Sequence, residues 1–239
     1  MKRILCIGGW GCPPAAWDPL ARALPDTALE STPWWTCLGP EEGFAKRLMG
    51  ARERPALLVG WSLGAIALLR AVLSPDGASL PAVLLLAGSA RLTAADAYEG
   101  ADPRALRAMR MRLSREPRAV LAGFAALCAA PDVAASDFAS RYVEQSGAVP
   151  AGALQEGLEF LEQTDLRGRL GRWAVPVKWL HGECDAVVPV QSARWAAARA
   201  PNIQLEVLSG RGHALPWIAV DEVARHVRGL LEWAHPWHP

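Results

Sequence analysis

The sequence predicts an α/β domain, in which helices cover both faces of a mostly parallel sheet. Short, nearly continuous apolar runs of strand length alternate along the chain with segments whose apolar residues recur at helical spacing. Hydrophobic residues make up 51% of the 239 residues, which is enough for one large core. The alternation is interrupted once, by a stretch without strand patterns, which predicts a helical insertion.

The elements follow in chain order. Five apolar runs are interpreted as strands, of which the last alternates less cleanly: 4–7, 57–59, 83–86, 177–180 and 205–208. Helices are expected over 17–24, 43–49, 65–73, 191–199 and 221–233. The last of these helices opens with Asp221 as a cap.

The interruption divides the chain into a core, residues 1–91 and 171–239, and a helical insertion, residues 92–170. Asp102-Pro103 is typical of a helix start, and Pro117 begins a second helix. Two further helices are predicted from apolar residues at helical spacing, namely Phe138 and Tyr142, then Leu154, Leu158 and Leu161. Ligands of open α/β sheets bind at strand ends, so we expect this insertion to act as a lid.

Composition excludes several classes of protein. The net charge of +1 favours neither nucleic acid nor a charged membrane surface, and no apolar run has the roughly 20 residues that span a bilayer. The start of the chain is interpreted as the first strand rather than a signal peptide, so a cytoplasmic protein is expected. A monomer is expected as well. The five cysteines are odd in number and lack a C-x-x-C pair, which predicts neither a disulfide framework nor a zinc site, and no cofactor is expected.

Ser62 is the candidate nucleophile. It lies in Gly60-Trp61-Ser62-Leu63-Gly64, between the apolar run 56–59 and the helical segment that follows. The G-x-S-x-G motif in this context pins a serine on a strained strand-to-helix turn, where glycines allow the backbone to pass close to its neighbours. The alternative is a small-residue turn that merely packs a helix on the sheet.

A serine hydroxyl needs a base, and the base needs a group that orients it. In the chain order Ser, Asp, His, the acid should follow a late strand and the histidine should lie in the last loop. Asp185 and His213 occupy these positions. Glu183 is the rival acid and His181 the rival base, while Asp185 as a helix cap and His213 as an ordinary loop histidine remain alternatives.

The glycine-rich loop Gly8-Gly9-Trp10-Gly11 follows the first predicted strand. It can point a backbone N–H into the site, and the N–H of Trp10 is the expected donor of an oxyanion hole. The second donor is the residue after the nucleophile, Leu63. Phosphate binding is the competing interpretation, but the loop has neither G-x-G-x-x-G nor the Lys-Ser/Thr of a P-loop.

These motifs resemble the α/β-hydrolase superfamily. Within it the chain is most similar to the pimeloyl-[acyl-carrier protein] methyl ester esterases of biotin synthesis, a group of BioH-type carboxylesterases. The resemblance runs from Gly8 onward and includes the more specific insertion segments 157–161 and 164–167. It implies a Ser62, Asp185 and His213 triad, with oxyanion donors at Trp10 and Leu63. The chain begins at what resembles the third strand of the full fold, so the leading hairpin is expected to be missing.

The resemblance also implies substrate and partner contacts. Trp10 and Phe124 are expected to line an acyl pocket, and arginines of the insertion to dock an acyl carrier protein. The candidates are Arg107, Arg110, Arg115 and Arg118, within a dense arginine cluster that also holds Arg104 and Arg112. An acidic carrier would be attracted to this cluster, but a solvated face that keeps an apolar lid soluble explains it equally well. The eleven tryptophans indicate either a wide apolar pocket or plain core packing.

The preferred hypothesis is therefore a serine carboxylesterase that acts on the methyl ester of pimeloyl-[acyl-carrier protein] and on small-molecule esters. A broad short-acyl carboxylesterase or a thioesterase is the alternative among enzymes. A non-catalytic binding protein with a hydrolase fold is the alternative of another class, and the intact set of three candidate residues argues against it.

Overall fold

The structure is a computed structural model that describes residues 1–50, 54–132, 136–171, 173 and 175–233. Within these residues a six-stranded sheet has the order β2-β1-β3-β4-β5-β6, and every neighbouring pair is parallel. The strands are β1 (Lys2–Ile7), β2 (Thr27–Thr32), β3 (Leu57–Trp61), β4 (Ala82–Leu86), β5 (Val177–Gly182) and β6 (Ile203–Leu208). The predicted α/β class is confirmed.

Five of these strands match the apolar runs, and β2 is the strand that the sequence pattern missed. Strands β3 and β4 lie in the middle of the sheet, and all of their residues are buried, which explains their continuous apolar sequence. Strand β2 is an edge strand that pairs only with β1, and none of its residues is fully buried. Its sequence, Thr-Ala-Leu-Glu-Ser-Thr, is therefore mixed and carries little strand pattern.

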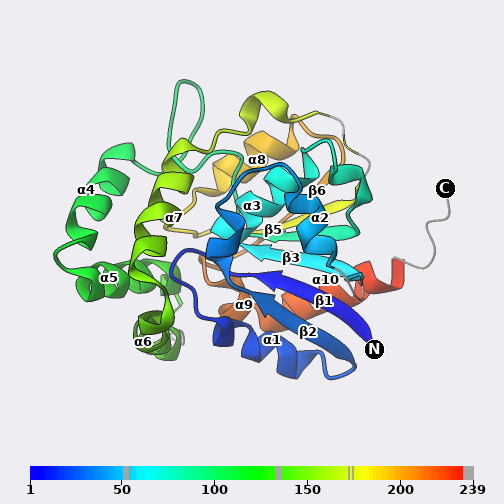
Figure 1. Cartoon of the computed structure of the whole chain (residues 1–239), viewed down its shortest axis with the longest axis horizontal. Coiled ribbons are helices and arrows are strands. Elements are labelled where there is room, and N and C mark those ends of the chain that lie inside the picture. The colour runs from blue at the N-terminus through cyan, green and yellow to red at the C-terminus, as the bar shows by residue number, and fades with distance from the viewer. Residues whose placement is uncertain (51–53, 133–135, 172, 174, 234–239) are drawn as a thin grey trace.

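Helices cover both faces of the sheet (Figure 1). Helices α1, α9 and α10 lie on one face, and α2, α3 and α8 lie on the other. Their bounds are α1 (Asp18–Ala23), α2 (Phe44–Met49), α3 (Leu63–Val72), α8 (Val190–Ala197), α9 (Leu215–Ile218) and α10 (Val220–Trp233). Short 3-10 turns are η1 (Pro14–Trp17), η2 (Trp34–Cys37), η3 (Gly77–Ser79), η5 (Ser146–Ala148) and η6 (Arg167–Arg169). No helix within the described ranges is long and apolar enough to cross a membrane.

The helical insertion lies between β4 and β5 and contains four α-helices within its described residues. They are α4 (Pro103–Leu113), α5 (Pro117–Ala129), α6 (Ser136–Gln145) and α7 (Ala151–Gln163). Helix α4 begins where the sequence predicted, because Asp102 Oδ1 accepts a hydrogen bond of 2.8 Å from the Arg104 amide. The four helices stand beyond the carboxyl ends of β1, β2 and β3 (Figure 1). The strand ends and the insertion therefore enclose the same region.

Candidate active site

Ser62 sits on a strained turn between β3 and α3. Its φ of 55° and ψ of −115° are unusual for a residue with a side chain, and its amide donates to the Leu86 carbonyl at the end of β4. The flanking glycines make this turn possible. A Cβ at Gly60 would lie 2.6 Å from the Gly64 carbonyl oxygen, and a Cβ at Gly64 would overlap backbone oxygens of β1 and its loop. The motif is thus a close backbone crossing as well as a turn.

Ser62, His213 and Asp185 come together although 151 residues separate the first two. His213 Nε2 lies 2.9 Å from Ser62 Oγ, and His213 Nδ1 lies 2.7 Å from Asp185 Oδ2. A carboxylate only accepts hydrogen bonds, so Nδ1 donates to Asp185 and Nε2 is left to accept the serine proton. All three side chains are buried, with 7%, 0% and 8% of the residue surface exposed for Ser62, His213 and Asp185. This arrangement can activate a hydroxyl for attack on an acyl carbon.

Asp185 is held by four groups. Its Oδ1 accepts hydrogen bonds of 2.8 Å from the amides of both Val187 and Val188. Burial pushes the pKa of Asp185 upward, but the electrostatic interaction with His213 and the hydrogen bonds from His181 and His213 outweigh burial and hold the pKa well below its usual range. The carboxylate therefore stays ionised beside the imidazole of His213.

The rival residues occupy supporting or peripheral positions. His181 is fully buried, and its Nε2 lies 2.9 Å from the Val188 carbonyl oxygen and 3.4 Å from Asp185 Oδ2. It packs against the acid rather than against the Ser62 hydroxyl. Glu183 is exposed and accepts hydrogen bonds from Ser209 Oγ and the Gly210 amide. Neither has the contacts of a base or acid for Ser62.

The loop that carries His213 is fixed at several points. Trp61 Nε1 donates to the His213 carbonyl at 2.8 Å. A Cβ at Gly212 would overlap the Ala130 carbonyl oxygen just after α5, and a Cβ at Gly182 would overlap the backbone oxygen of Gly212. Glycines at these two positions allow the acid loop, the histidine loop and the end of α5 to pack backbone against backbone. Close packing of this kind holds the imidazole in one orientation.

The glycine-rich loop after β1 passes directly against the serine. Strands β1 and β3 pair with Ile7 opposite Gly60, so this loop and the Ser62 turn leave the sheet side by side. A Cβ at Gly9 would lie 3.0 Å from Ser62 Cβ. Trp10 follows Gly9, and Leu63 is the first residue of α3. Both expected oxyanion donors therefore belong to backbone that borders Ser62.

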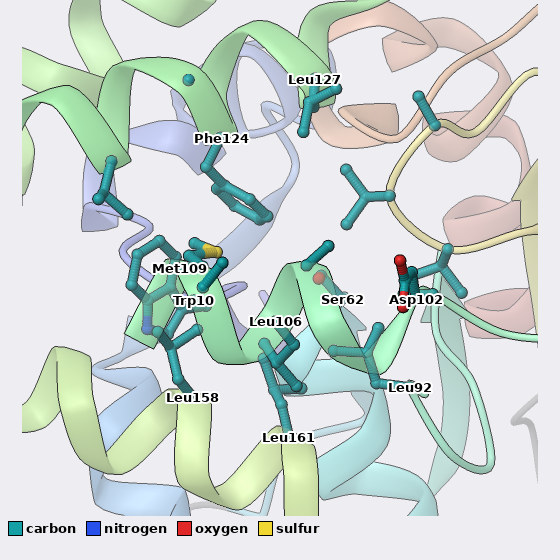
Figure 2. Close-up of a pocket in the computed structure, with 18 of the residues that line it drawn as sticks. Trp10, Ser62, Leu92, Asp102, Leu106, Met109, Phe124, Leu127, Leu158 and Leu161 are labelled. Carbon is teal, nitrogen blue, oxygen red and sulfur yellow. The ribbon is translucent and has the colours of Figure 1, made fainter. Parts of the chain in front are cut away.

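Ser62 lies at one side of an apolar cavity of about 720 Å³ (Figure 2). Trp10, Phe124 and Met109 form one part of the lining, and Leu106, Leu158 and Leu161 of the insertion form another. The rings of Trp10 and Phe124 meet edge to face, with centroids 5.2 Å apart. Among the described lining residues, Asp102 and Arg112 carry charge. The volume and the apolar lining suit a small or medium-chain ligand.

The tryptophans divide between pocket and core. Among the described tryptophans, Trp10 is the one that lines this cavity. Trp17, Trp34 and Trp61 are buried in the core. Pocket lining therefore explains Trp10, and packing explains Trp17, Trp34 and Trp61.

The arginine candidates differ in their surroundings. Arg110 is half-buried and forms ion pairs with Glu159 and Glu162 of α7, so it fastens α4 to α7. Arg112 pairs with Glu116 at 3.0 Å. The other arginines of the cluster are exposed and form no ion pair within the described ranges: Arg104, Arg107, Arg115 and Arg118. Charge available to a partner lies on these four.

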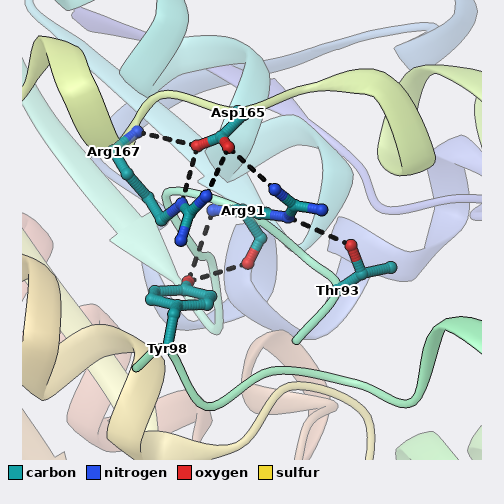
Figure 3. A network of polar contacts seen from close by, with 5 residues as sticks. All are labelled: Arg91, Thr93, Tyr98, Asp165 and Arg167. Atoms are coloured by element: carbon teal, nitrogen blue, oxygen red, sulfur yellow. Dashed lines mark hydrogen bonds and ion pairs between the residues drawn. The ribbon is translucent and has the colours of Figure 1, made fainter. Parts of the chain in front are cut away.

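A polar network joins the two ends of the insertion (Figure 3). Asp165 accepts hydrogen bonds from Arg91 at 2.9 Å and from Arg167 at 2.8 and 2.9 Å. Tyr98 donates to the Arg91 carbonyl at 2.8 Å, and the Arg167 guanidinium lies over its ring. The Leu166 amide also donates to the Ala90 carbonyl. The insertion is therefore closed at its base, beside the core.

Sequence reasoning missed the polar contacts that α6 and η5 make with the glycine-rich loop. The sequence predicts Tyr142 only as part of a helix face, yet its hydroxyl donates to the Trp10 carbonyl. Ser146 Oγ donates to the Gly11 carbonyl at 3.2 Å. The one available signal was a hydroxyl on an otherwise apolar helix face, since such a group needs a partner when it is buried.

Comparisons with known proteins place the chain among esterases. It is 34% identical over 181 residues to the pimeloyl-[acyl-carrier protein] methyl ester esterase of Xanthomonas campestris pv. campestris, and this match covers 74% of this chain and 70% of that protein. It is 28% identical to the protein of the same name from Aromatoleum aromaticum, over 92% of this chain and 93% of that one. It is also 28% identical to the biotin biosynthesis bifunctional protein BioHC of Cellvibrio japonicus, and this match covers 47% of that longer protein. No protein-family model matches the chain.

Solved structures agree on the fold. An esterase from Exiguobacterium antarcticum superposes with a TM-score of 0.81 at 16% identity, over 97% of this chain and 92% of that one. A bromoperoxidase from Bacillus anthracis superposes with a TM-score of 0.79 at 20% identity over the same shares. On its sequence relatives and its fold, this chain belongs to the family of pimeloyl-[acyl-carrier protein] methyl ester esterases, carboxylic ester hydrolases with the α/β-hydrolase fold.

Proposed function

We propose that this chain hydrolyses the methyl ester of pimeloyl-[acyl-carrier protein] through an acyl-enzyme. Ser62 is the nucleophile, His213 the general base and then the general acid, and Asp185 the group that orients the imidazole. The observation that carries the proposal is the continuous chain of hydrogen bonds from Asp185 through His213 to Ser62, beside an apolar cavity. We infer the substrate from the two relatives above, each of which is named as an esterase of this compound.

In the acylation step, Ser62 Oγ attacks the ester carbonyl carbon while its proton moves to His213 Nε2. The carbonyl oxygen becomes an oxyanion, which the amides of Trp10 and Leu63 stabilise. The bond from the carbonyl carbon to the methoxy oxygen then breaks, and the leaving oxygen takes the proton from Nε2. Methanol departs, and the acyl group remains on Ser62.

In the deacylation step, water attacks the acyl carbon and gives one proton to His213 Nε2. The bond to Ser62 Oγ breaks, and that oxygen recovers the proton from Nε2. The products are the free carboxylic acid of the acyl group, which then loses its proton to water, and the resting enzyme. Throughout both steps the ionised Asp185 stabilises the imidazolium that forms on His213.

The surroundings of Ser62 support a carrier-bound acyl substrate. The cavity has an apolar lining that suits a methylene chain. Helices α4 and α5 line the cavity, and α4, the turn that follows it and α5 carry Arg107, Arg115 and Arg118 respectively, which are exposed and form no ion pair with any described residue. We propose that these three attract an acidic carrier protein, whereas Arg110 stabilises the insertion through its two glutamates.

The catalytic part is tested with a fluorophosphonate probe and with methyl pimeloyl-carrier protein as substrate. The wild-type protein should be labelled and should release methanol, and Ser62→Ala should do neither. In a bacterial strain that lacks its own pimeloyl-carrier-protein methyl ester esterase, wild type should restore growth without biotin. Cleavage of p-nitrophenyl esters without restored growth would favour the broad short-acyl esterase, and an unlabelled wild type would favour a binding protein.

The docking part is tested by charge reversal. Arg107→Glu combined with Arg115→Glu should raise KM for the carrier-bound substrate by about tenfold and leave p-nitrophenyl ester hydrolysis unchanged. The control combines Arg22→Glu on α1 with Arg228→Glu on α10; both arginines are exposed, and neither lines the cavity. An equal rise in KM from the control pair would contradict docking at the insertion.

A further inference from the structure

Three polar contacts from the helical insertion hold the loop that borders Ser62. The Trp10 carbonyl accepts a hydrogen bond from the Tyr142 hydroxyl, and the Gly11 carbonyl accepts one of 3.2 Å from Ser146 Oγ. The indole Nε1 of Trp10 donates to the Leu154 carbonyl at 2.7 Å. These partners belong to α6, η5 and α7, so three segments of the insertion contact two consecutive loop residues.

Tyr142 is built into this contact. The residue is 1% exposed, and its ring packs against Phe138 and Phe124 with centroids 5.5 and 6.1 Å apart. Burial raises the pKa of the Tyr142 phenol well above its ordinary value, so the hydroxyl keeps its proton and remains a donor. Gly11 has a φ of +69°, and a Cβ there would lie 2.5 Å from the Tyr142 hydroxyl oxygen. The glycine leaves room for the hydroxyl to reach the loop backbone.

The contacts restrict the amide of Trp10 in particular. The ring of Trp10 is anchored at Nε1 and its carbonyl is anchored at oxygen, so little freedom remains for its φ and ψ. An oxyanion donor is effective when its direction is set before the reaction, because no reorganisation is then needed as charge develops. The insertion therefore helps to set the direction of this N–H, together with the Cys12 amide, which donates to the Gly9 carbonyl of the same peptide unit at 3.1 Å.

We propose that Tyr142 is a positioning residue for the reaction: its hydroxyl, carried by α6, holds the Trp10 carbonyl and so helps to fix the φ and ψ of Trp10 that direct the Trp10 N–H at the oxyanion. This inference rests on the proposed function. Tyr142 does not belong to the lining of the cavity, so it acts through Trp10 and not on the substrate. Oxyanion stabilisation then requires the insertion to be seated on the core, which couples the insertion to catalysis.

The two tyrosines of the chain make a matched pair for the test. Tyr98 is also buried and also donates to a backbone carbonyl, that of Arg91, but at the base of the insertion. For each Tyr→Phe variant we would measure kcat and KM for p-nitrophenyl butyrate. We would also measure inhibition by a trifluoromethyl ketone, to which Ser62 adds to form a tetrahedral oxyanion. Thermal unfolding reports the loss of stability in both variants.

Tyr142→Phe should lower kcat about three- to tenfold, the range for one lost hydrogen bond, and weaken the trifluoromethyl ketone by the same factor while KM stays the same. Tyr98→Phe should leave kcat and inhibition unchanged. A kcat of wild-type size in Tyr142→Phe, an equal loss in both variants, or unchanged inhibition would each overturn the proposal. If Tyr142→Phe does not fold, Ser146→Ala removes the neighbouring bond to Gly11 and is judged by the same measurements.

Failure of this inference is distinct from failure of the proposed function. Fluorophosphonate labelling of wild type at Ser62 is measured in the same experiment. An unlabelled wild type would refute the esterase proposal itself. A labelled, active wild type together with a fully active Tyr142→Phe would refute only the positioning role.

Discussion

Asp185→Asn is the change for which the structure dictates the outcome most closely. Oδ1 of Asp185 receives the amides of Val187 and Val188, so the carbonyl oxygen of an asparagine must occupy that position. Its NH₂ group would then face His213 Nδ1, which now lies 2.7 Å from Oδ2. An NH₂ group only donates, so Nδ1 would have to accept and the proton would move to Nε2. An imidazole protonated at Nε2 cannot take the proton of Ser62.

The size of the expected loss in kcat follows from this change of tautomer. The corresponding exchange in a Ser-His-Asp protease preserves the geometry and lowers kcat by about 10⁴, and we expect a loss of the same order here. This corresponds to about 5 kcal/mol of transition-state stabilisation. The bonds to Val187 and Val188 survive in the asparagine variant, so the fold should be retained while activity is lost.

The assay is kcat for p-nitrophenyl butyrate, together with the thermal unfolding midpoint of each protein. Glu183→Gln is the matched control, because Glu183 lies two residues away and is exposed, and its carboxylate accepts hydrogen bonds from Ser209 and Gly210. Its kcat should stay within about twofold of wild type. A folded Asp185→Asn variant that keeps more than about a tenth of wild-type kcat would refute the reasoning from the tautomer.

Two further predictions concern stability. Asp165→Asn should lower the free energy of unfolding by about 1 kcal/mol near neutral pH, because the ion pairs of Asp165 are partly exposed. The hydrogen bond from Arg167 is the largest of the effects that hold the pKa of Asp165 below its usual range. The difference in unfolding free energy between wild type and variant should therefore be complete above the ordinary carboxyl pKa of about 3.9, and it should shrink as the pH falls below that value. Urea unfolding at several pH values measures it, and a difference that grows on acidification would contradict the sign. Gly64→Ala should cost about 3 kcal/mol or prevent folding, since its Cβ would overlap the Ile7 carbonyl oxygen. Gly229→Ala on the exposed side of α10, where nothing lies within 4 Å of a Cβ, is the control and should stabilise the helix slightly.

The elements that the sequence predicted well are those whose surroundings leave a periodic mark. Strands β3 and β4 are buried on both faces, so every residue is apolar and the run is visible. Helix α4 carries Asp102 as an N-cap and proline at its first position. Strand β2 left no such mark, because its pairing with β1 comes from backbone groups that every residue has. An edge strand of mixed polarity is therefore decided by its neighbour in the sheet.

The sequence by itself determined which side chains carry the proposed chemistry, because Ser62, Asp185 and His213 each follow a recognisable strand in a recognisable loop. Tertiary structure decided what each of these groups faces. It placed the His213 imidazole 2.9 Å from the Ser62 hydroxyl and paired Arg110 with two glutamates. It also brought the Tyr142 hydroxyl to the Trp10 carbonyl. Local pattern records the period and the polarity of a segment. Contacts between segments 49 to 151 residues apart depend on how whole helices and sheets pack, and no short stretch of sequence encodes that packing.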